Sequence, residues 1–250
     1  MRMSKKVLQT LGTAVFWLAV WFGAAAAVGS EVLLPSPTQT LRALADLLQT
    51  ATFYKSVVFS VLRLSLGYVA GVTAGVLFGA LTYRFAALRT LFAPLISGVK
   101  ATPVASFIIL LFVWFSNGTV AAVTSSLIVL PIIWSAVFTA LGEVDGQLLE
   151  MARVFGVPKR RVLAKIVVPS VRPSFKGAAA TAMGLCWKAG IAAEVICSPK
   201  NSIGAGLYDA KIYLDIPSLF AWTLVVVLVS VMLEKLLVKL VLRNKKGAAK

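Results

Sequence analysis

Six apolar segments, each long enough to cross a bilayer, constrain this chain more than any other feature of its sequence. A helix needs about 20 apolar residues to span the hydrocarbon core of a membrane. Backbone groups find no water there, so a run of this length must be helical. The expected spans are Leu11–Val28, Ser56–Tyr83, Leu91–Phe115, Val120–Leu141, Phe175–Ile196 and Pro217–Val238. We therefore predict an all-α integral membrane protein with six transmembrane helices.

Short connections between the spans indicate a single transmembrane domain over residues 1–250. Within it, residues 1–28 form an N-terminal helix, residues 56–240 form the core, and residues 143–174 form a loop between the fourth and fifth spans. Hydrophobic residues make up 59% of the chain and charged residues 14%, against roughly 45–50% and 25% in soluble domains. The first span also resembles a signal peptide with Ala24–Ala27 as its cleavage site. However, that run is long for a signal core, and a chain with five further spans needs no cleaved signal.

Basic residues predict the orientation of the chain. A net charge of +16 would suggest a nucleic-acid partner in a soluble protein, but here the charges flank apolar spans and no such partner is expected. With the N-terminus inside, 18 basic residues lie on the inner side and four on the outer side. The positive-inside rule then places both termini and the long loop of this multi-pass chain in the cytoplasm.

The residues that enzymes and metal sites need are scarce in this chain. It has no histidine, which removes the commonest general base and metal ligand, so neither a catalytic nor a metal site is expected. Cys186 and Cys197 are separated by about 16 Å of helical rise, too far for a disulfide. No GxxxxGK[ST] phosphate loop is present, so energy from ATP would have to come from another chain. A membrane enzyme is therefore disfavoured, and a secondary transporter is disfavoured because no inverted repeat is visible.

Two outer connections carry local signals. Ser36, Pro37 and Thr38 can cap a helix, and leucines at helical spacing follow them, which predicts a short helix on the outer surface. Residues 198–216 are expected to form a second outer loop, in which Gly204 and Gly206 provide turns.

The second span contains a glycine stripe. Gly67, Gly71, Gly75 and Gly79 recur every four residues and so share one helix face. Small residues at this spacing let another helix backbone approach closely. The partner helix can belong to the same subunit, or the stripe can form a seam between subunits or a gating surface.

The loop after the fourth span is predicted to fold as helix, tight turn and helix. Glu143 and Asp145 stand near the start of the first helix, where its dipole favours acids. Gly156 ends that helix, and Pro158 suits the first turn of the next one. The loop therefore has a defined shape at the membrane surface.

These residues match a motif. Glu150-Met151-Ala152 is followed by three residues and Gly156, and nine further residues lead to Ile166-Val167-Val168-Pro169. In this spacing the chain resembles the permease subunits of ABC importers, whose signature reads Glu-Ala-Ala, three residues, Gly, nine residues, Ile-x-Leu-Pro. Met151 and Val168 depart from that pattern but remain apolar. The resemblance implies that the loop is a coupling element that docks on a separate ATPase. The implied coupling residues are Glu150, Met151, Ala152, Arg153, Gly156, Val157 and Pro158.

Three further stretches resemble the nitrate, sulfonate, taurine and bicarbonate branch of that family. They are Leu34-Pro35-Ser36-Pro37, Lys100-Ala101-Thr102-Pro103 and Gly204-Ala205-Gly206-Leu207-Tyr208. This resemblance implies import of a small anionic or zwitterionic solute, with a thiamine-precursor-like heterocycle or another small organic solute as the alternative. It also implies two ATPase subunits that bind ATP and magnesium, a second copy of the permease, and an extracytoplasmic solute-binding protein. The chain itself is expected to hold no cofactor.

Four charged residues fall inside the expected spans, where a charge is costly unless it faces a cavity or a partner. Arg63 is expected to extend to the outer surface. Lys188 and Glu194 are six residues apart and do not share a helix face. Candidate residues of the translocation path are Lys100, Trp187, Lys188 and Glu194, and Lys100 lies between Pro94 and Pro103, where a break in the helix is expected.

Overall fold

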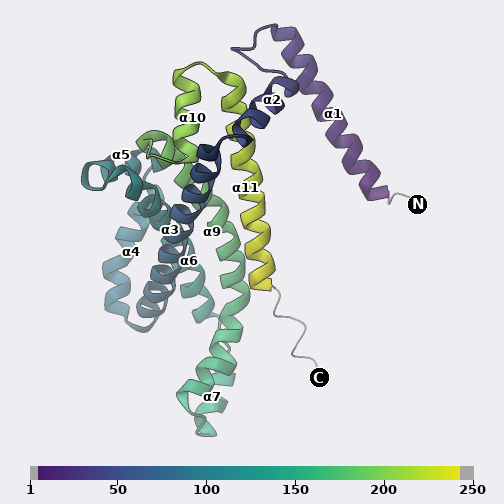
Figure 1. The fold of residues 1–250 in the computed structure, drawn as a ribbon. Coiled ribbons are helices and arrows are strands. Elements are labelled where there is room, and N and C mark those ends of the chain that lie inside the picture. The colour runs from purple at the N-terminus through teal and green to yellow at the C-terminus, as the bar shows by residue number, and fades with distance from the viewer. Residues whose placement is uncertain (1–4, 243–250) are drawn as a thin grey trace.

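The structure is a computed structural model that describes residues 5–242, and every regular element in that range is helical (Figure 1). The elements are α1 (Lys5–Val28), α2 (Pro37–Leu48), α3 (Ala51–Arg84), α4 (Ala86–Ala101), α5 (Val104–Trp114), α6 (Asn117–Gly142), α7 (Gly146–Val154), α8 (Lys159–Val162), the π-helical turn η1 (Leu163–Val167), α9 (Val168–Cys197), α10 (Ile203–Ile212) and α11 (Ile216–Leu242). Arg2 and the basic residues between positions 243 and 250 lie outside the described residues.

The core consists of three long helices, in which α6 packs along both α3 and α9 and these two also contact each other. The glycine stripe makes the first contact possible. A Cβ on Gly71 would come within 2.7 Å of the Ser126 backbone oxygen, and one on Gly75 within 2.7 Å of the Ile133 Cβ. All four stripe glycines face α6 of the same chain. Close backbone approach is the way helices gain packing energy in lipid, where no hydrophobic force draws them together.

The third expected span is broken. Residues 91–115 were expected to form one span with a break between Pro94 and Pro103, and the break is present, because α4 and α5 are bent by 109° relative to each other. The bend falls at Thr102 and Pro103, because a residue that precedes proline is pushed out of the helical region; Thr102 has ψ 130°. Pro94, in contrast, is accommodated inside α4. Within residues 5–242, five helices are long and apolar enough to cross a membrane, and the bent pair brings the number to six if it counts as one span.

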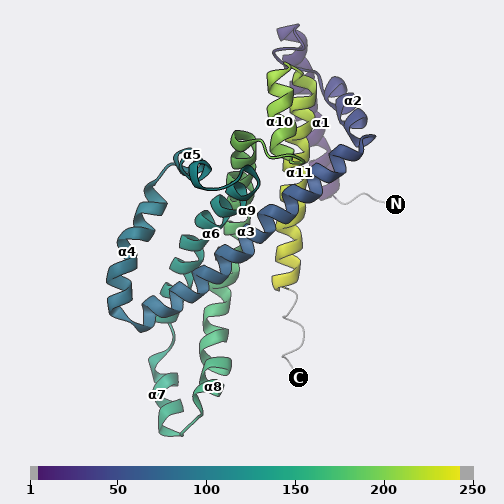
Figure 2. The same ribbon diagram turned by 60° about the vertical axis from the view of Figure 1, so that its left-hand side comes forward.

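The molecule has two distinct ends (Figures 1 and 2). The loop end carries α7 and α8, which extend beyond the other helices, and the opposite end, here called the α10 end, carries α2 and α10. The short helix α2 confirms that the leucines after Pro37 mark a helix. Its N-terminus is closed by a capping box, in which the Ser36 backbone N–H donates to the Gln39 side chain at 2.7 Å.

The expected loop at residues 198–216 is instead mostly the helix α10. Gly204 and Gly206 lie within it and serve close packing, not turns. A Cβ on Gly204 would overlap the backbone of Glu194, and one on Gly206 would meet the Trp222 ring at 2.5 Å. The turns that flank α10 are made by Ser198, Asn201 and Leu214, all of which have positive φ.

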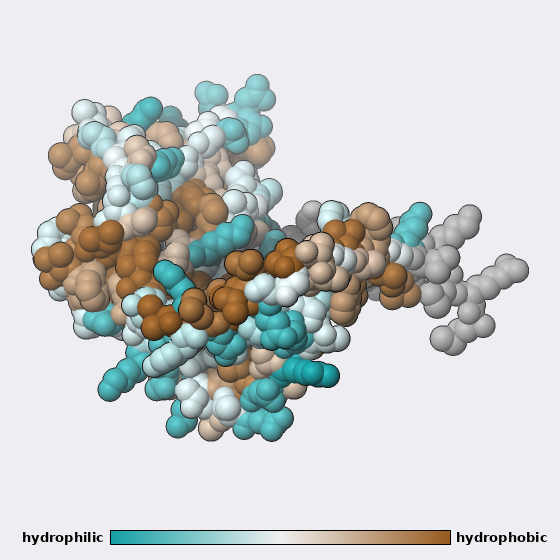
Figure 3. Space-filling model, turned by 90° about the horizontal axis from the view of Figure 1, so that it is seen from above, coloured by the Kyte–Doolittle hydropathy of each residue, from teal (hydrophilic) through white to brown (hydrophobic). Residues whose placement is uncertain are grey.

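Helix α1 stands apart from the other helices (Figures 1 and 3). Near its C-terminal end, the Trp21 indole N–H donates to the Pro35 carbonyl at 3.0 Å, and its ring lies 5.9 Å from that of Phe220. In the span Leu11–Val28 only 6% of the residues are buried. Figure 3, which looks onto the α10 end, shows the apolar surface of this arm extending to one side of the molecule.

Candidate coupling loop and membrane-depth charges

Helix α7, in the loop between α6 and α9, is capped at both ends by residues of the loop itself. The Asp145 carboxylate accepts a hydrogen bond from the Gln147 backbone N–H at 2.8 Å and caps α7. At the other end the Val157 N–H donates to the Ala152 carbonyl at 2.9 Å, and the Gly156 N–H donates to the Arg153 carbonyl at 3.1 Å. This pair of bonds is a Schellman motif. It requires a positive φ at its glycine, and Gly156 has φ 61°.

Helix α7 buries little of its apolar surface against the rest of the chain. Ala152 is 2% exposed, but Met151 is 49% exposed, Val154 79% and Phe155 77%. The expected coupling residues Glu150, Arg153, Gly156 and Pro158 are also exposed, and Val157 is half-buried. Sequence reasoning missed Val154 and Phe155. Two large apolar residues directly before a helix-ending glycine, in a loop outside the bilayer, were the signal that could have found them.

The helix that follows the turn is longer than expected. Pro158 precedes α8 as its N-terminal cap, and helical structure then continues from Lys159 to Cys197 without a break. The expected return to the bilayer at Pro169 and Pro173 therefore takes place inside one helix. A proline normally clashes with the carbonyl four residues earlier, and the π-helical turn η1, which ends two residues before Pro169, changes the hydrogen-bond register there. Such turns inside long helices are often found at functional sites.

At the α10 end, a buried ion pair joins three helices. Glu194 of α9 is fully buried, and its carboxylate accepts from Arg63 of α3 at 2.5 Å and from the Ser60 hydroxyl at 2.6 Å. It also accepts from the Gly204 backbone N–H at 3.3 Å, while the Ser60 hydroxyl oxygen accepts from the Ile203 N–H at 2.9 Å. These two N–H groups are free donors in the first turn of α10, so the carboxylate and the hydroxyl complete the cap that Ser202 begins.

This pair corrects the expectation for Arg63. Its side chain does not extend to the surface but is 16% exposed and bonded to Glu194. The expectation that Lys188 and Glu194 do not pair agrees with the structure, in which Glu194 pairs with Arg63 instead. A charge at membrane depth that is both paired and hydrogen-bonded avoids most of the cost of desolvation.

Of the four candidate path residues, two are buried and two are exposed. Trp187 is 1% exposed and donates to the Val226 carbonyl of α11 at 3.0 Å, so it packs inside the chain, as Glu194 does. Lys188 is exposed, on a face of α9 that it shares with Thr181 and Gly184, and a Cβ on Gly184 would meet no atom within 4 Å. Lys100 is also exposed, and its ammonium lies 5.7 Å from the Trp134 ring centre.

The two cysteines are not joined to each other, as their spacing predicted, and both are buried. Within the described part of the chain no group of three or more His, Cys, Asp or Glu side chains is placed to hold a metal ion.

Comparison with known proteins identifies the family. Residues 71–245 match the family model described as binding-protein-dependent transport system inner membrane component. A probable ABC transporter permease of Brucella melitensis is 25% identical over 82% of this chain and 84% of its own length. A putative aliphatic sulfonates transport permease of Bacillus subtilis is 22% identical over 78% of this chain and 70% of its own. A formylaminopyrimidine transport permease of Halalkalibacterium halodurans is 27% identical over 68% of this chain and 70% of its own.

A solved structure shares the fold. The MetNI methionine ABC transporter, in an inward-facing conformation, contains a chain that matches with a TM-score of 0.63 and 17% identity over 80% of this chain and 97% of its own. The family match covers well over half of the chain and includes α7. The chain is thus a membrane-embedded transport component that leaves ATP hydrolysis to a separate subunit, and it belongs to the binding-protein-dependent permeases of ABC importers.

Proposed function

We propose that α7 and the turn after it form the docking element through which a separate ATPase drives this permease. The observation that carries the proposal is the exposed apolar tip formed by Met151, Val154 and Phe155 on a capped, rigid helix beyond the other helices. Exposed apolar surface outside a bilayer marks an interaction site. Large side chains at the centre of an interface contribute most of its binding energy, so Phe155 would enter a groove on the ATPase.

The test is copurification of the ATPase with variants of the permease. Phe155→Ala should reduce the amount of ATPase retained, because it removes the largest apolar side chain of the tip. Tyr213→Ala is the matched control, since Tyr213 is 80% exposed but lies at the α10 end. Retention should fall for Phe155→Ala alone. Equal retention by both variants would contradict docking through this tip.

The proposed assembly contains two ATPase subunits, a second copy of this permease and a solute-binding protein on the outer side. ATP and magnesium would bind to the ATPase subunits and not to this chain. The excess of basic residues at the loop end supports a cytoplasmic position for α7 and for both termini. The α10 end would then face the binding protein.

For the solute, the proposal is a small anion or zwitterion of the nitrate, sulfonate, taurine or bicarbonate type. It is supported by the exposed cations Lys188 and Lys100 and by the sulfonate permease among the relatives. Trp187 and Glu194 would pack beneath the residues that line the path, because neither is exposed. The formylaminopyrimidine permease supports the alternative, a heterocyclic solute carried by the same architecture. Uptake of radiolabelled taurine and of a labelled aminopyrimidine into the same vesicles would separate the two.

A further inference from the structure

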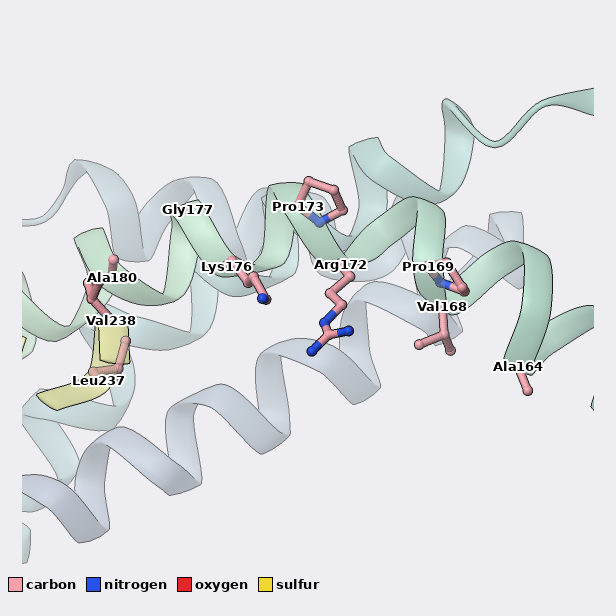
Figure 4. Close-up of a pocket in the computed structure, with 10 residues that line it drawn as sticks. All are labelled: Ala164, Val168, Pro169, Arg172, Pro173, Lys176, Gly177, Ala180, Leu237 and Val238. Carbon is pink, nitrogen blue, oxygen red and sulfur yellow. The ribbon is translucent and has the colours of Figure 1, made fainter. Parts of the chain in front are cut away.

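Two pockets of about 640 Å³ each lie at opposite ends of the molecule and differ in their linings. The pocket at the loop end lies between α9 and the last turns of α11 (Figure 4), and apart from Arg172 and Lys176 its lining is apolar. The pocket at the α10 end lies between α10 and the first turns of α3 and α11, and most of its lining side chains carry a hydroxyl, an amide or a charge. This second pocket, here called the polar pocket, has no part in the coupling and path proposals.

Two hydrogen-bond donors that line the polar pocket, the Trp222 indole N–H and the Ser56 hydroxyl, are bonded to none of residues 5–242. Both side chains are more than nine-tenths buried, with Trp222 6% and Ser56 4% exposed. Buried indole N–H groups usually find a partner, as those of Trp134 and Trp187 do in this chain. Within residues 5–242, the fully enclosed side-chain polar atom without a partner is the Thr124 hydroxyl oxygen. The two donors are therefore accessible, and the space that they reach is the polar pocket.

The two donors lie beside the N-terminal half of α10. A Cβ on Gly206 would lie 2.7 Å from the Trp222 indole nitrogen, which places the N–H against the first turns of that helix. Ser56 stands one turn before Ser60 on α3, and the Ser60 hydroxyl oxygen accepts from the Ile203 N–H at the start of α10. A hydroxyl and an indole N–H are donors that the oxygen atoms of a sulfonate or a carboxylate can accept from.

Exposed charges of both signs also line the polar pocket. Lys200 lies in the turn before α10, Asp209 in the last turn of α10, and Asp215 in the connection that follows. The helix rises by about 9 Å between Ile203 and Asp209, so the cation and the two carboxylates stand toward opposite ends of the pocket. An ammonium group is attracted to the end with the carboxylates, and a plain anion is repelled there. The arrangement therefore matches a solute that carries charges of both signs.

We propose that the polar pocket is an outer binding site for a small zwitterion. Its anionic group would accept from the Ser56 hydroxyl and the Trp222 N–H, with Lys200 at that end, and its ammonium group would face Asp209 and Asp215. The inference rests on the proposed import of a small solute and on the proposed outer position of the α10 end. It narrows the solute class, because nitrate and bicarbonate have no ammonium group to place at the carboxylates.

Hydrogen bonds next to the pocket hold its walls in place. The Ser60 hydroxyl donates to Glu194 at 2.6 Å, and the Ser202 hydroxyl, which lines the pocket, bonds to backbone groups on both sides of it. The charge of Glu194 is paired with Arg63 and so is compensated close to the anionic group of the solute. A site whose walls are fixed before the solute arrives loses less affinity to ordering.

The experiment measures equilibrium binding of labelled taurine to the full chain purified with its ATPase. Isethionate, which carries a hydroxyl in place of the ammonium group, is the matched probe, and the native protein should bind taurine more tightly. Trp222→Phe keeps a ring beside Phe53 but removes the N–H, and Ser56→Ala removes the hydroxyl. Each should weaken taurine binding roughly tenfold, the effect of one hydrogen bond to a charged group. Trp17→Phe is the control, because Trp17 is 63% exposed on α1 and does not line the pocket.

A double variant tests the ammonium end of the site. Asp209→Asn with Asp215→Asn should weaken the binding of taurine but not that of isethionate, and so reduce the preference for taurine. A change in preference separates this effect from misfolding, which would weaken the binding of both probes. Glu143→Gln is the control, since Glu143 is exposed at the loop end.

Native taurine affinity in both Trp222→Phe and Ser56→Ala would overturn the proposal. Equal binding of taurine and isethionate by the native protein, or no binding of taurine, would overturn it as well. Binding of a labelled aminopyrimidine in place of taurine would assign the pocket to a heterocycle instead. Uptake of taurine into vesicles by the native protein tests the import proposal separately, so a pocket that fails the binding test leaves that result standing.

Discussion

The two ends of α9 use charge and apolar surface in opposite ways. At the α10 end, Glu194 is fully buried and makes bonds to Arg63, Ser60 and Gly204. At the loop end, the helix continues into a projecting loop whose tip leaves Val154 and Phe155 more than three-quarters exposed. The buried charge at the α10 end thus has its partners within the chain, while the loop end presents apolar surface that another protein can cover.

Glycine shows the same contrast. Gly204 is required because the backbone of Glu194 lies where its Cβ would be. Gly156 has open space around its Cα, and the requirement there is the positive φ of 61°. The first glycine brings two helices together, whereas the second one aims a helix away from the body of the molecule. A difference in partner contact between the two ends follows from these constraints.

The largest expected difference is in exposure to the two sides of the membrane. In a chain whose native cysteines are replaced, single cysteines at Ser36 and Asn201 should react with an impermeant thiol reagent in intact cells. A cysteine at Lys159 should react only after lysis, because α8, which begins at this residue, lies at the opposite end (Figure 2). Reaction of Lys159→Cys in intact cells would reverse the proposed orientation.

The second prediction removes the ion pair at the α10 end. Glu194→Ala leaves Arg63 charged, partly buried and unpaired, and this should destabilise the chain by up to about 3–5 kcal/mol. Thermal unfolding of the purified permease measures the loss. Glu143→Ala is the control, since Glu143 is exposed. Replacement of both partners by leucine should cost clearly less than Glu194→Ala, and an equal cost would mean that the pair contributes specific geometry beyond charge compensation.

The third prediction changes the direction of the loop. A valine at position 156 cannot adopt the positive φ without a cost of roughly 1–2 kcal/mol, so Gly156→Val should shift α7 and leave the spans intact. ATPase retention should fall, or ATP hydrolysis should continue without uptake, and Glu150→Lys should act in the same way by reversing a charge beside the tip. Gly146→Val is the control, because Gly146 also has open space but no positive φ. Full uptake and full ATPase retention by Gly156→Val would disprove the coupling role of the loop.

The sequence predicted the loop end better than the α10 end, and the reason is physical. The shape of α7 depends on Asp145, Gly156 and Pro158, which act on their immediate neighbours, so a local pattern reveals them. The pair of Arg63 and Glu194 joins residues 131 positions apart, and neither residue carries a local sign of the other. Sequence alone could not match them.

The misread glycines of α10 teach a related lesson. Gly204 and Gly206 were expected in turns, because a glycine in a polar stretch usually marks one. Their role is close contact with Glu194 and Trp222, which depends on how α9, α10 and α11 pack. The N-terminal cap Ser202, whose hydroxyl oxygen accepts from the Ala205 N–H at 2.9 Å, was the local signal that predicts a helix here.

The smallest expected effect lies between the two ends, at Lys188. This residue is exposed on α9, on a face that the described part of the chain leaves open around Gly184. If the solute passes along that face as an anion, Lys188→Met removes one charged contact, worth roughly tenfold in uptake, and leaves ATPase retention unchanged. Lys188→Glu should reduce uptake of an anion further and that of a neutral solute less. Lys211→Met, on α10 and outside the polar pocket, is the control. Normal uptake by Lys188→Met would place the path on another face of the permease, and the open face of α9 would then be free to pack against a second copy.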